Sequence, residues 1–312
     1  MATAATAQSN DAGPSTSTSP ATQAAVFKRL HPDQYLQRFL AQGYRPDGRK
    51  VSAWRDVSIN VAEGSALVRM GDTTIVCGIK AEIAEPSGAA PDEGFVVPNI
   101  DLPALSSPKF KPGPPVDEAQ TMSNWLNDML VSSRTLPPKS LIIAPGKAAW
   151  VIYIDVVCIN YDGNAYDAAV LAVMAALRNT RLPSAKYDET TFQTVCNWDD
   201  KHPLPLGRMP LCASFGVFES AGTVLDSSSH PAAKILVADS RTYLLPDPTA
   251  FEQPLLPTTI TIALDENNRA ATVRQEGLGG VVGKSGSELL DEAWSAAEGH
   301  IQELRQILEQ SS

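Results

Sequence analysis

Hydrophobic and polar residues alternate in the first half of the chain, and this alternation predicts strands. Apolar residues occupy every second position of 57–61, and the runs 66–70 and 73–83 flank Gly71 and Asp72 like the arms of a hairpin. A strongly apolar, β-branched run at 148–159 predicts a buried strand. The domain is therefore expected to open with an antiparallel meander and a long central strand.

Helical spacing follows the strands in both halves. After the turn at Asp162 and Gly163, Asn164 is expected to cap a helix whose apolar residues include Ala168, Leu171 and Leu177. The second half repeats the order, with strands expected at 211–218, 234–238, 258–264 and 271–274 and a final amphipathic helix through 290–308. The order suggests two related halves, although no repeat of residues is visible.

Prolines interrupt the pattern twice. Residues 86–115, with many prolines, are expected to be irregular, and so is the loop 181–210. Between them, apolar residues at helical spacing predict a helix around 122–130 that ends before Pro137 and Pro138.

The amino-terminal residues differ from the rest in composition. Among the first 25 there are eight Ala and nine Ser or Thr, and Asp11 is the only charged residue. Such a segment has too little apolar surface to offset the entropy of ordering it, so residues 1–28 are expected to form a disordered tail. The ordered domain is expected to span 29–310, with a first half at 29–182, a second half at 205–310, and an opening helix starting at His31.

Charge and cysteine content narrow the possible functions. The formal net charge is −10, so nucleic acid cannot be held by a general positive surface, and any RNA contact must be local. The four cysteines form no C-x-x-C pair and are expected to be reduced core thiols. No apolar run is long enough for a membrane span and no signal peptide is visible, so a chain that is neither secreted nor inserted in a membrane is expected.

Motifs for nucleotides, metals or nucleophilic catalysis are weak. Residues 277–285 approximate a P-loop but are better explained as a turn followed by a capping box, and the four histidines are scattered. The serines 227–229 lie in a polar stretch without a nucleophile elbow. Several acidic residues at expected strand ends could hold Mg²⁺, but turns and helix starts explain them better: Asp155, Asp162, Asp167, Asp239, Asp247 and Glu252. We therefore expect no catalytic residue, no metal and no cofactor.

Several motifs in order along the chain resemble RNase PH-type domains. They occupy residues 44–49, 64–80, 150–155, 162–169 and 175–177. Further motifs at 96–99, 102–103, 110–120 and 247–252 resemble the inactive subtype that alternates with phosphorolytic-type subunits in the ring of the RNA exosome, and within it one subunit type. The resemblance covers about residues 30–310. It implies an α+β, RNase PH-like fold of the ribosomal protein S5 domain 2 kind, with two βαβ-type halves around a common core.

The resemblance also implies that this chain has lost the phosphorolytic activity of active relatives. Active relatives bind phosphate at the start of the helix after the central strand, where this chain places Asp162 and Asp167, which are expected to fill the anion site and repel phosphate. Paired arginines of active relatives are replaced by 115–117 (Pro, Val, Asp). Asp247 and Glu252 survive in one acidic region, whereas the other catalytic acid falls on the apolar residues 255–257.

The implied function is that of a non-catalytic structural subunit of the exosome ring, which supports 3′-to-5′ RNA processing and degradation, including rRNA maturation and mRNA turnover. Its implied partners are other RNase PH-like ring subunits, with an active-type subunit as direct dimer partner, S1/KH cap subunits, catalytic exoribonucleases and RNA in the ring channel. Its implied locations are nucleus, nucleolus and cytoplasm. Lys109 and Lys111, before a Gly-Pro turn, are the candidate RNA contacts. The alternatives are an active phosphate-dependent 3′-to-5′ exoribonuclease and an acidic α/β enzyme of small metabolites.

Overall fold

The computed structural model describes residues 19–220, 242–277 and 286–311. Within the chain two compact units are distinguished, Met1–Gly48 and Arg49–Ser312. The domain bounds of 29–310 stay a prediction.

The first unit contains two short helices, α1 (Pro20–Leu30) and α2 (Pro32–Leu40). Helix α1 corrects the prediction of a disordered tail through residue 28. It begins with a capping arrangement in which the Ser19 side chain accepts a hydrogen bond from the Thr22 amide, and proline occupies the first turn. Polar capping rather than an apolar stripe therefore marks this helix.

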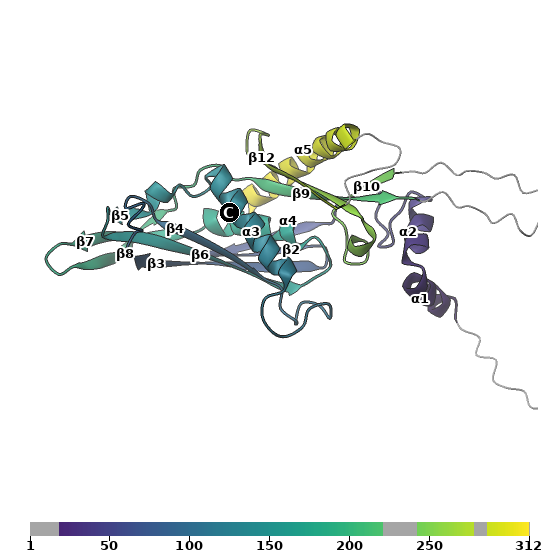
Figure 1. Cartoon of the computed structure of the whole chain (residues 1–312), viewed down its shortest axis with the longest axis horizontal. Helices are drawn as coiled ribbons and strands as arrows, with labels where there is room; N and C mark the ends of the chain where they lie inside the picture. Colours follow the sequence, from purple (N-terminus) through teal and green to yellow (C-terminus); the bar gives the residue numbers. More distant parts are fainter. Residues whose placement is uncertain (1–18, 221–241, 278–285, 312) are drawn as a thin grey trace, which may run out of the picture. The chain divides into compact units, whose positions relative to one another are not determined.

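The second unit opens with a six-stranded sheet (Figure 1). Its strands are β1 (Val57–Ala62), β2 (Ser65–Met70), β3 (Thr73–Ala84), β4 (Phe95–Asp101), β5 (Ile142–Ala144) and β6 (Ala148–Asn160). They are ordered β1-β2-β3-β6-β4, with β5 paired to β6, and only β4 runs parallel to β6. The expected meander and central strand are confirmed, whereas β4 corrects the prediction that 86–115 is irregular.

Two helices lie against this sheet. Helix α3 (Asp117–Ser133) contacts β4 and β12 (Ala270–Gly277), and α4 (Ala165–Arg178) contacts β1, β2, β3, β6 and β9 (Leu211–Glu219). Every residue of α4 except Arg178 is buried, because alanines at six of its fourteen positions let sheets approach it on opposite sides. A short 3₁₀ helix at Pro138–Leu141 leads from α3 toward β5.

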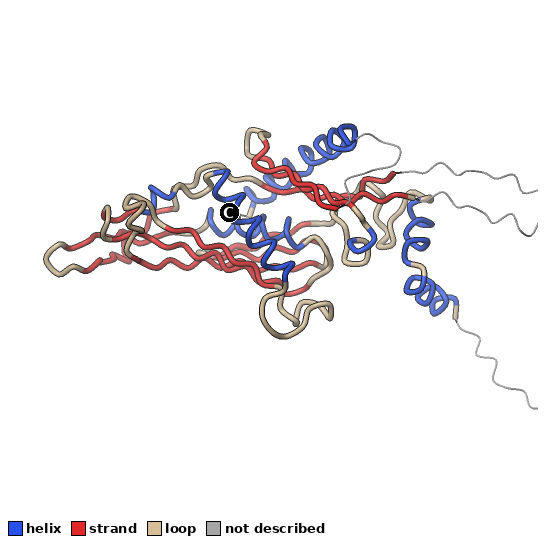
Figure 2. The backbone as a smooth tube through the Cα atoms, viewed as in Figure 1, coloured by secondary structure: helices blue, strands red, loops and turns tan. Residues whose placement is uncertain are grey.

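The second half is a four-stranded sheet in the order β10-β9-β11-β12, followed by α5 (Gly286–Gln310). Its strands are β9 (Leu211–Glu219), β10 (Thr242–Pro246), β11 (Thr258–Leu264) and β12 (Ala270–Gly277), with a 3₁₀ turn at Gln253–Leu255. Strand β9 is buried on both faces, since Ser214 bonds to Asp167 of α4 and Phe215 packs on Trp54, which stacks on His300 of α5. Figure 2 shows the strands of this sheet in red beside α5.

A separate hairpin connects the halves. It consists of β7 (Arg181–Asp188) and β8 (Gln193–Pro203), paired antiparallel with a register shift after Pro183. The prediction that 181–210 is irregular is therefore wrong. Strand β10 was also not predicted, and the predicted strand 234–238 lies outside the described residues.

Both halves contribute to one hydrophobic core, which contains side chains from α3, α4, α5 and both large sheets. The α+β class with two sheet-and-helix halves around a common core is thereby confirmed. No helix among the described residues is both long enough and apolar enough to cross a membrane.

Candidate functional site

Asp247 lies at the end of β10, where the two halves meet, and it is fully buried. The Arg55 guanidinium donates two hydrogen bonds to the Asp247 carboxylate: Nη2 lies 2.6 Å from Oδ1, and Nε lies 2.7 Å from Oδ2. Arg49 adds Nη1 at 3.4 Å from Oδ2. Burial alone would raise the pKa of Asp247, but the hydrogen bonds and charge of Arg55 outweigh it and hold the pKa below its usual value. Asp247 is therefore an anion whose two oxygens are occupied.

Asn164 joins Asp247 to a second buried carboxylate. Its Nδ2 donates to Asp247 Oδ1 at 2.8 Å and to Asp167 Oδ2 at 2.9 Å. Asn164 occupies the N-cap position of α4 as predicted, but it is in the left-handed region (φ 47°) and its side chain bridges the acids instead of capping the helix. The Asn164 amide thus bridges two buried carboxylates.

Asp167 binds strand β9. Its carboxylate accepts hydrogen bonds from the Ser214 amide (2.7 Å) and from Ser214 Oγ (2.7 Å). Burial raises the pKa of Asp167 to about 6, although Asn164 and Ser214 counteract part of this shift. The expectation that Asp167 fills an anion site at the start of α4 is corrected accordingly, because the carboxylate links α4 to the second sheet.

The loop before α4 completes this cluster. Arg55 Nη1 donates to the Asp162 carbonyl at 2.8 Å, and the Arg55 and Asp162 side chains lie 3.6 Å apart. Gly163 (φ +78°) approaches the turn after Asp247 so closely that an added Cβ would lie 2.5 Å from the Ala250 amide nitrogen. Only glycine fits there. The ion pairs of Arg55 and the close backbone contact at Gly163 therefore connect the two halves.

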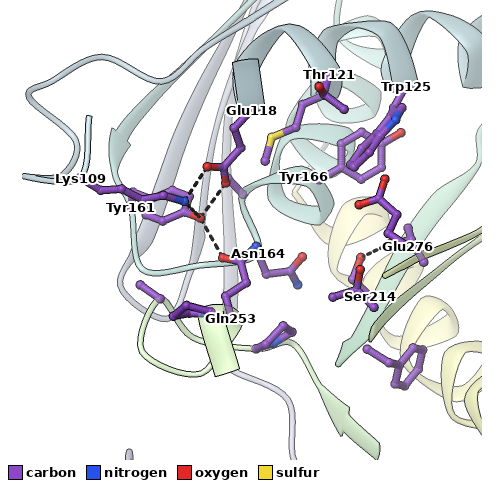
Figure 3. Close-up of a pocket in the computed structure, with 18 residues that line it drawn as sticks. Lys109, Glu118, Thr121, Trp125, Tyr161, Asn164, Tyr166, Ser214, Gln253 and Glu276 are labelled. Atoms are coloured by element: carbon purple, nitrogen blue, oxygen red, sulfur yellow. Dashed lines mark hydrogen bonds and ion pairs between the residues drawn. The ribbon is translucent and has the colours of Figure 1, made fainter. Parts of the chain in front are cut away.

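A pocket of about 670 Å³ opens beside this cluster (Figure 3). It lies between the first turns of α3 and α4, strands β9, β11 and β12, and the turn after β10. Its lining consists of Lys109, Glu118, Thr121, Met122, Trp125, Tyr161, Asn164, Ala165, Tyr166, Ser214, Phe215, Pro248, Ala250, Gln253, Pro254, Thr259, Thr261 and Glu276.

One side of the pocket is a polar cluster around Lys109. The Lys109 ammonium lies 2.5 Å from Glu118 Oε2, and the Tyr161 hydroxyl lies 3.0 Å from Glu118 Oε1 and 2.8 Å from Gln253 Oε1 (Figure 3). Burial, followed by the negative charge of Glu118, raises the pKa of Tyr161 well above its usual value. Tyr161 therefore stays a neutral hydroxyl, and Lys109 is already paired.

The other side is aromatic. Trp125 and Tyr166 meet edge to face with ring centres 5.6 Å apart, and the Arg274 guanidinium covers Trp125 at 4.3 Å. Glu276 lies below these rings, and partial burial raises its pKa. Among the lining residues two carboxylates, Glu118 and Glu276, face one lysine, and the Arg274 guanidinium on Trp125 offsets the charge of Glu276, so the pocket has no excess of cationic groups.

The other acidic candidates have structural surroundings. Asp155 pairs with Lys80 at 2.6 Å, and Glu252 accepts from the Thr249 amide at 2.9 Å, as a residue closing a turn does. Among the residues that the structure describes, no three Asp, Glu, His or Cys side chains are placed to hold a metal ion together. Asp239 and the serines 227–229 lie outside these residues, as does 278–285 of the P-loop-like segment.

The apolar replacement expected at 255–257 has a packing role. Leu256 is 7% exposed, and it packs so tightly on Gly216 of β9 that an added Cβ on that glycine would meet its side chain at 2.1 Å. A hydrocarbon side chain therefore covers this part of β9.

The most important partner of Asp247, Arg55, was not predicted from the sequence. Arg55 stands 192 positions away and carries no local signal of its role. Of the predicted RNA contacts, Lys109 lies at the pocket and Lys111 in the neighbouring Pro-rich loop.

The fold and the position of these clusters between two sheet-and-helix halves define an RNase PH-type protein. Residues 47–183 match the family described as "3′ exoribonuclease family, domain 1". A solved structure described as the Archaeoglobus fulgidus exosome with RNA bound to the active site superimposes with a TM-score of 0.68; it is 26% identical and covers 88% of this chain and 96% of that one.

Two curated relatives are described as exosome complex components. The exosome complex component rrp43 of Schizosaccharomyces pombe is 39% identical over 80% of this chain and 86% of its own length. Exosome complex component Rrp42 of Thermococcus gammatolerans is 32% identical over 88% of this chain and 92% of its own length. The chain therefore belongs to the RNase PH family of exosome complex components. The subunit type that the sequence motifs resemble is ribosomal RNA-processing protein 43, in agreement with the first of these relatives.

Proposed function

We propose that this chain is a non-catalytic structural subunit of an RNA exosome ring. The observation that supports this most is the state of Asp247, one of the two acids that, by the resemblance, survive in the catalytic region. Two arginines and one asparagine donate to its carboxylate in a fully buried site. An oxygen held in this way neither coordinates a metal ion nor transfers a proton to a leaving group without breaking a buried ion pair.

The charge of the adjacent pocket supports the same proposal. Phosphorolysis requires inorganic phosphate beside an RNA end that is itself anionic, so its site needs several cationic donors. Here Glu118 holds Lys109, and Glu276 adds a further carboxylate. The resemblance implies that 115–117 replace the paired arginines of active relatives, and Asp117 and Glu118 make the first turn of α3 acidic.

Membership in the family of exosome complex components supports a proposal about the binding partners of the chain. We propose that the chain assembles with other RNase PH-like ring subunits, with an active-type subunit as its direct dimer partner. S1/KH cap subunits and the catalytic exoribonucleases of the exosome would contact the same ring. The chain would then serve rRNA maturation and mRNA turnover in nucleus, nucleolus and cytoplasm by building the ring and its channel.

In this proposal RNA contacts lysine residues of the loop before α3. Lys111 is exposed, and Lys109 is a half-exposed ammonium that Glu118 and the rings of Phe110 and Tyr161 hold in place. Lys111 can thus meet a phosphate at once, whereas Lys109 must first leave Glu118.

The test is an assay of single-stranded RNA with Mg²⁺ and inorganic phosphate. The purified chain should release no nucleoside diphosphate above background, with an active RNase PH-type enzyme as positive control. Phosphate-dependent shortening of RNA that disappears in Asp247→Asn, which preserves the shape of the side chain, would instead establish an active exoribonuclease. Co-purification with cap and RNase PH-like subunits at equal stoichiometry tests the structural role separately.

A further inference from the structure

Strand β8 and the turn that precedes it expose several large apolar side chains. Phe192 is 75% exposed, Val195 63% and Trp198 69%. In the described part of the chain no other stretch of seven residues exposes three large hydrophobic side chains. Exposed aromatic and apolar groups concentrated in one place mark a surface that a partner covers.

The backbone of β8 also has an open edge. Among the described strands β8 pairs only with β7, so one side of the strand presents amides and carbonyls that no ladder uses. An edge of this kind is a template for an added strand unless it is blocked. Residues 193–197 contain no proline and no charged side chain, so nothing blocks the edge there. Beyond Asn197 the register with β7 shifts, and residues 198–200 stand outside the ladder.

A groove lies between the hairpin and the first sheet. Its volume is about 690 Å³, and its apolar lining is contributed by Ile79, Ile83, Trp150, Leu182, Cys196 and Trp198. Trp198 thus belongs to both the exposed strand and the groove. An extended segment along β8 could place one of its side chains beside this indole.

Side-chain contacts hold the hairpin in place at both ends. Near its tip Lys147 pairs with Glu189 at 3.0 Å and lies over the Tyr187 ring at 5.2 Å. Near its base Lys201 pairs with Glu63 at 2.6 Å. The groove is therefore formed before any partner arrives, which lowers the entropic cost of binding.

The charges along β8 indicate the kind of partner. Asp199 lines a hollow together with Trp198, Glu63, Arg181 and Lys201, and Lys201 pairs with Glu63. Asp200 adds a third carboxylate, whose recorded partner is His202 at 3.4 Å, so the acidic groups outnumber Arg181 and Lys201 by three to two. His202 carries a charge only when it is protonated. This end of the strand therefore favours a segment with basic residues.

We propose that another subunit of the same complex adds an extended segment with lysine residues to the free edge of β8 and places an apolar side chain in the groove beside Trp198. Main-chain hydrogen bonds to the edge would supply part of the affinity, and the groove and Asp199 would select the segment. This inference rests on the proposed exosome assembly, but it concerns a surface remote from the Asp247 cluster in sequence.

Cys196 provides the first test. It lines the groove and is partly exposed, whereas Cys77, Cys158 and Cys212 are buried, with pKa values that burial raises. Maleimide should therefore label Cys196 selectively in the isolated full-length chain. In the complex purified through a different subunit, labelling should be at least tenfold slower, and hydrogen exchange of the 193–198 amides should slow as well. Equal labelling and exchange rates in both samples would overturn the inference.

Variants and cross-links identify what covers the groove. Trp198→Ser should restore maleimide labelling in the complex without changing the melting temperature, because the side chain is exposed; Val131→Ser, at a 67% exposed position on α3, is the matched control. Carbodiimide should join Asp199 or Asp200 to a lysine of another subunit. A cross-link to a second copy of this chain, or protection that ribonuclease removes, would overturn the proposal. If the chain does not co-purify with exosome subunits, the proposed function fails too, whereas a reactive Cys196 inside the complex refutes this inference alone.

Discussion

Asp247 and Glu118 are two carboxylates that meet basic side chains near the junction of the halves, in very different surroundings. Asp247 is fully buried and bonded by Arg55, Arg49 and Asn164, whereas the Glu118 side chain is 29% exposed and the Lys109 side chain is 55% exposed. A buried pair cannot exchange its partner for water, but a half-exposed pair can. Asp247 thus links the two halves through buried contacts, while the pocket beside it remains open.

The largest expected loss of unfolding free energy follows from removing the Asp247 carboxylate. Asp247→Ala leaves Arg55 buried without its anion, and breaking such a pair costs about 3–5 kcal/mol. Glu118→Ala should cost at most about 1 kcal/mol, since the Lys109 ammonium is free to move into water. Urea unfolding of both variants measures the difference. Similar losses of unfolding free energy in the two variants would show that Asp247 is not the buried link described here.

The close backbone contact at Gly163 provides a second test of the junction between the halves. Gly163→Ala should cost about 2–4 kcal/mol, because a left-handed conformation and a clash with the turn at 248–250 act together. Gly48→Ala provides the control: Gly48 has φ +90° and no atom within 4 Å of an added Cβ, so about 1 kcal/mol is expected from backbone strain alone. A smaller loss for Gly163→Ala than for Gly48→Ala in the same unfolding experiment would contradict the close approach.

Strands with regular alternation could be predicted from sequence, and the others could not for physical reasons. Strand β4 contains Pro98, which usually argues against a strand, but β4 lies at the sheet edge, where proline is tolerated. The β7–β8 hairpin exposes most of β8, so burial imposes no alternation on it. Helix α1 has a cap in Ser19 and Pro20 that a search for apolar stripes overlooks.

The candidate site was predicted less completely than the fold. Acidic residues such as Asp167 and Asp247 were singled out, and the resemblance indicated that phosphate chemistry is lost. Their partners are Arg55 and Ser214, at separations of 192 and 47 residues, and only tertiary packing brings them together. Without Arg55 the sequence suggested an anion site filled by carboxylates, whereas the structure shows carboxylates that bind the two halves to each other.

The pH dependence of stability should show two opposing groups near this junction. Burial raises the pKa of Asp167 to about 6, so the folded chain keeps a proton that the unfolded chain has lost, and this contribution to stability falls as pH rises from about 4 to 6. Burial lowers the pKa of His300 to about 4, so its contribution rises over about pH 4 to 6.5. The two contributions should nearly cancel.

Single variants separate the two contributions. In His300→Gln the unfolding free energy should fall as pH rises from 4.5 to 6, whereas in Asp167→Asn it should rise, each by up to about 1.4 kcal/mol per pH unit. Denaturant unfolding at several pH values measures both slopes. The same slope in both variants would mean that neither group titrates as its surroundings dictate.

The smallest effect on stability, but a specific one on RNA, is expected in the loop before α3. Lys111→Glu should leave the unfolding free energy within about 0.5 kcal/mol, because Lys111 is exposed. If Lys111 meets one phosphate in the assembled channel, the slope of log affinity against log salt should decrease by about 0.7–0.9. Lys109→Glu should add repulsion to Glu118 at the pocket and change stability slightly more than Lys111→Glu does. Salt titrations of RNA binding by reconstituted rings distinguish the two lysines, and an unchanged slope in Lys111→Glu would place this lysine outside the RNA path.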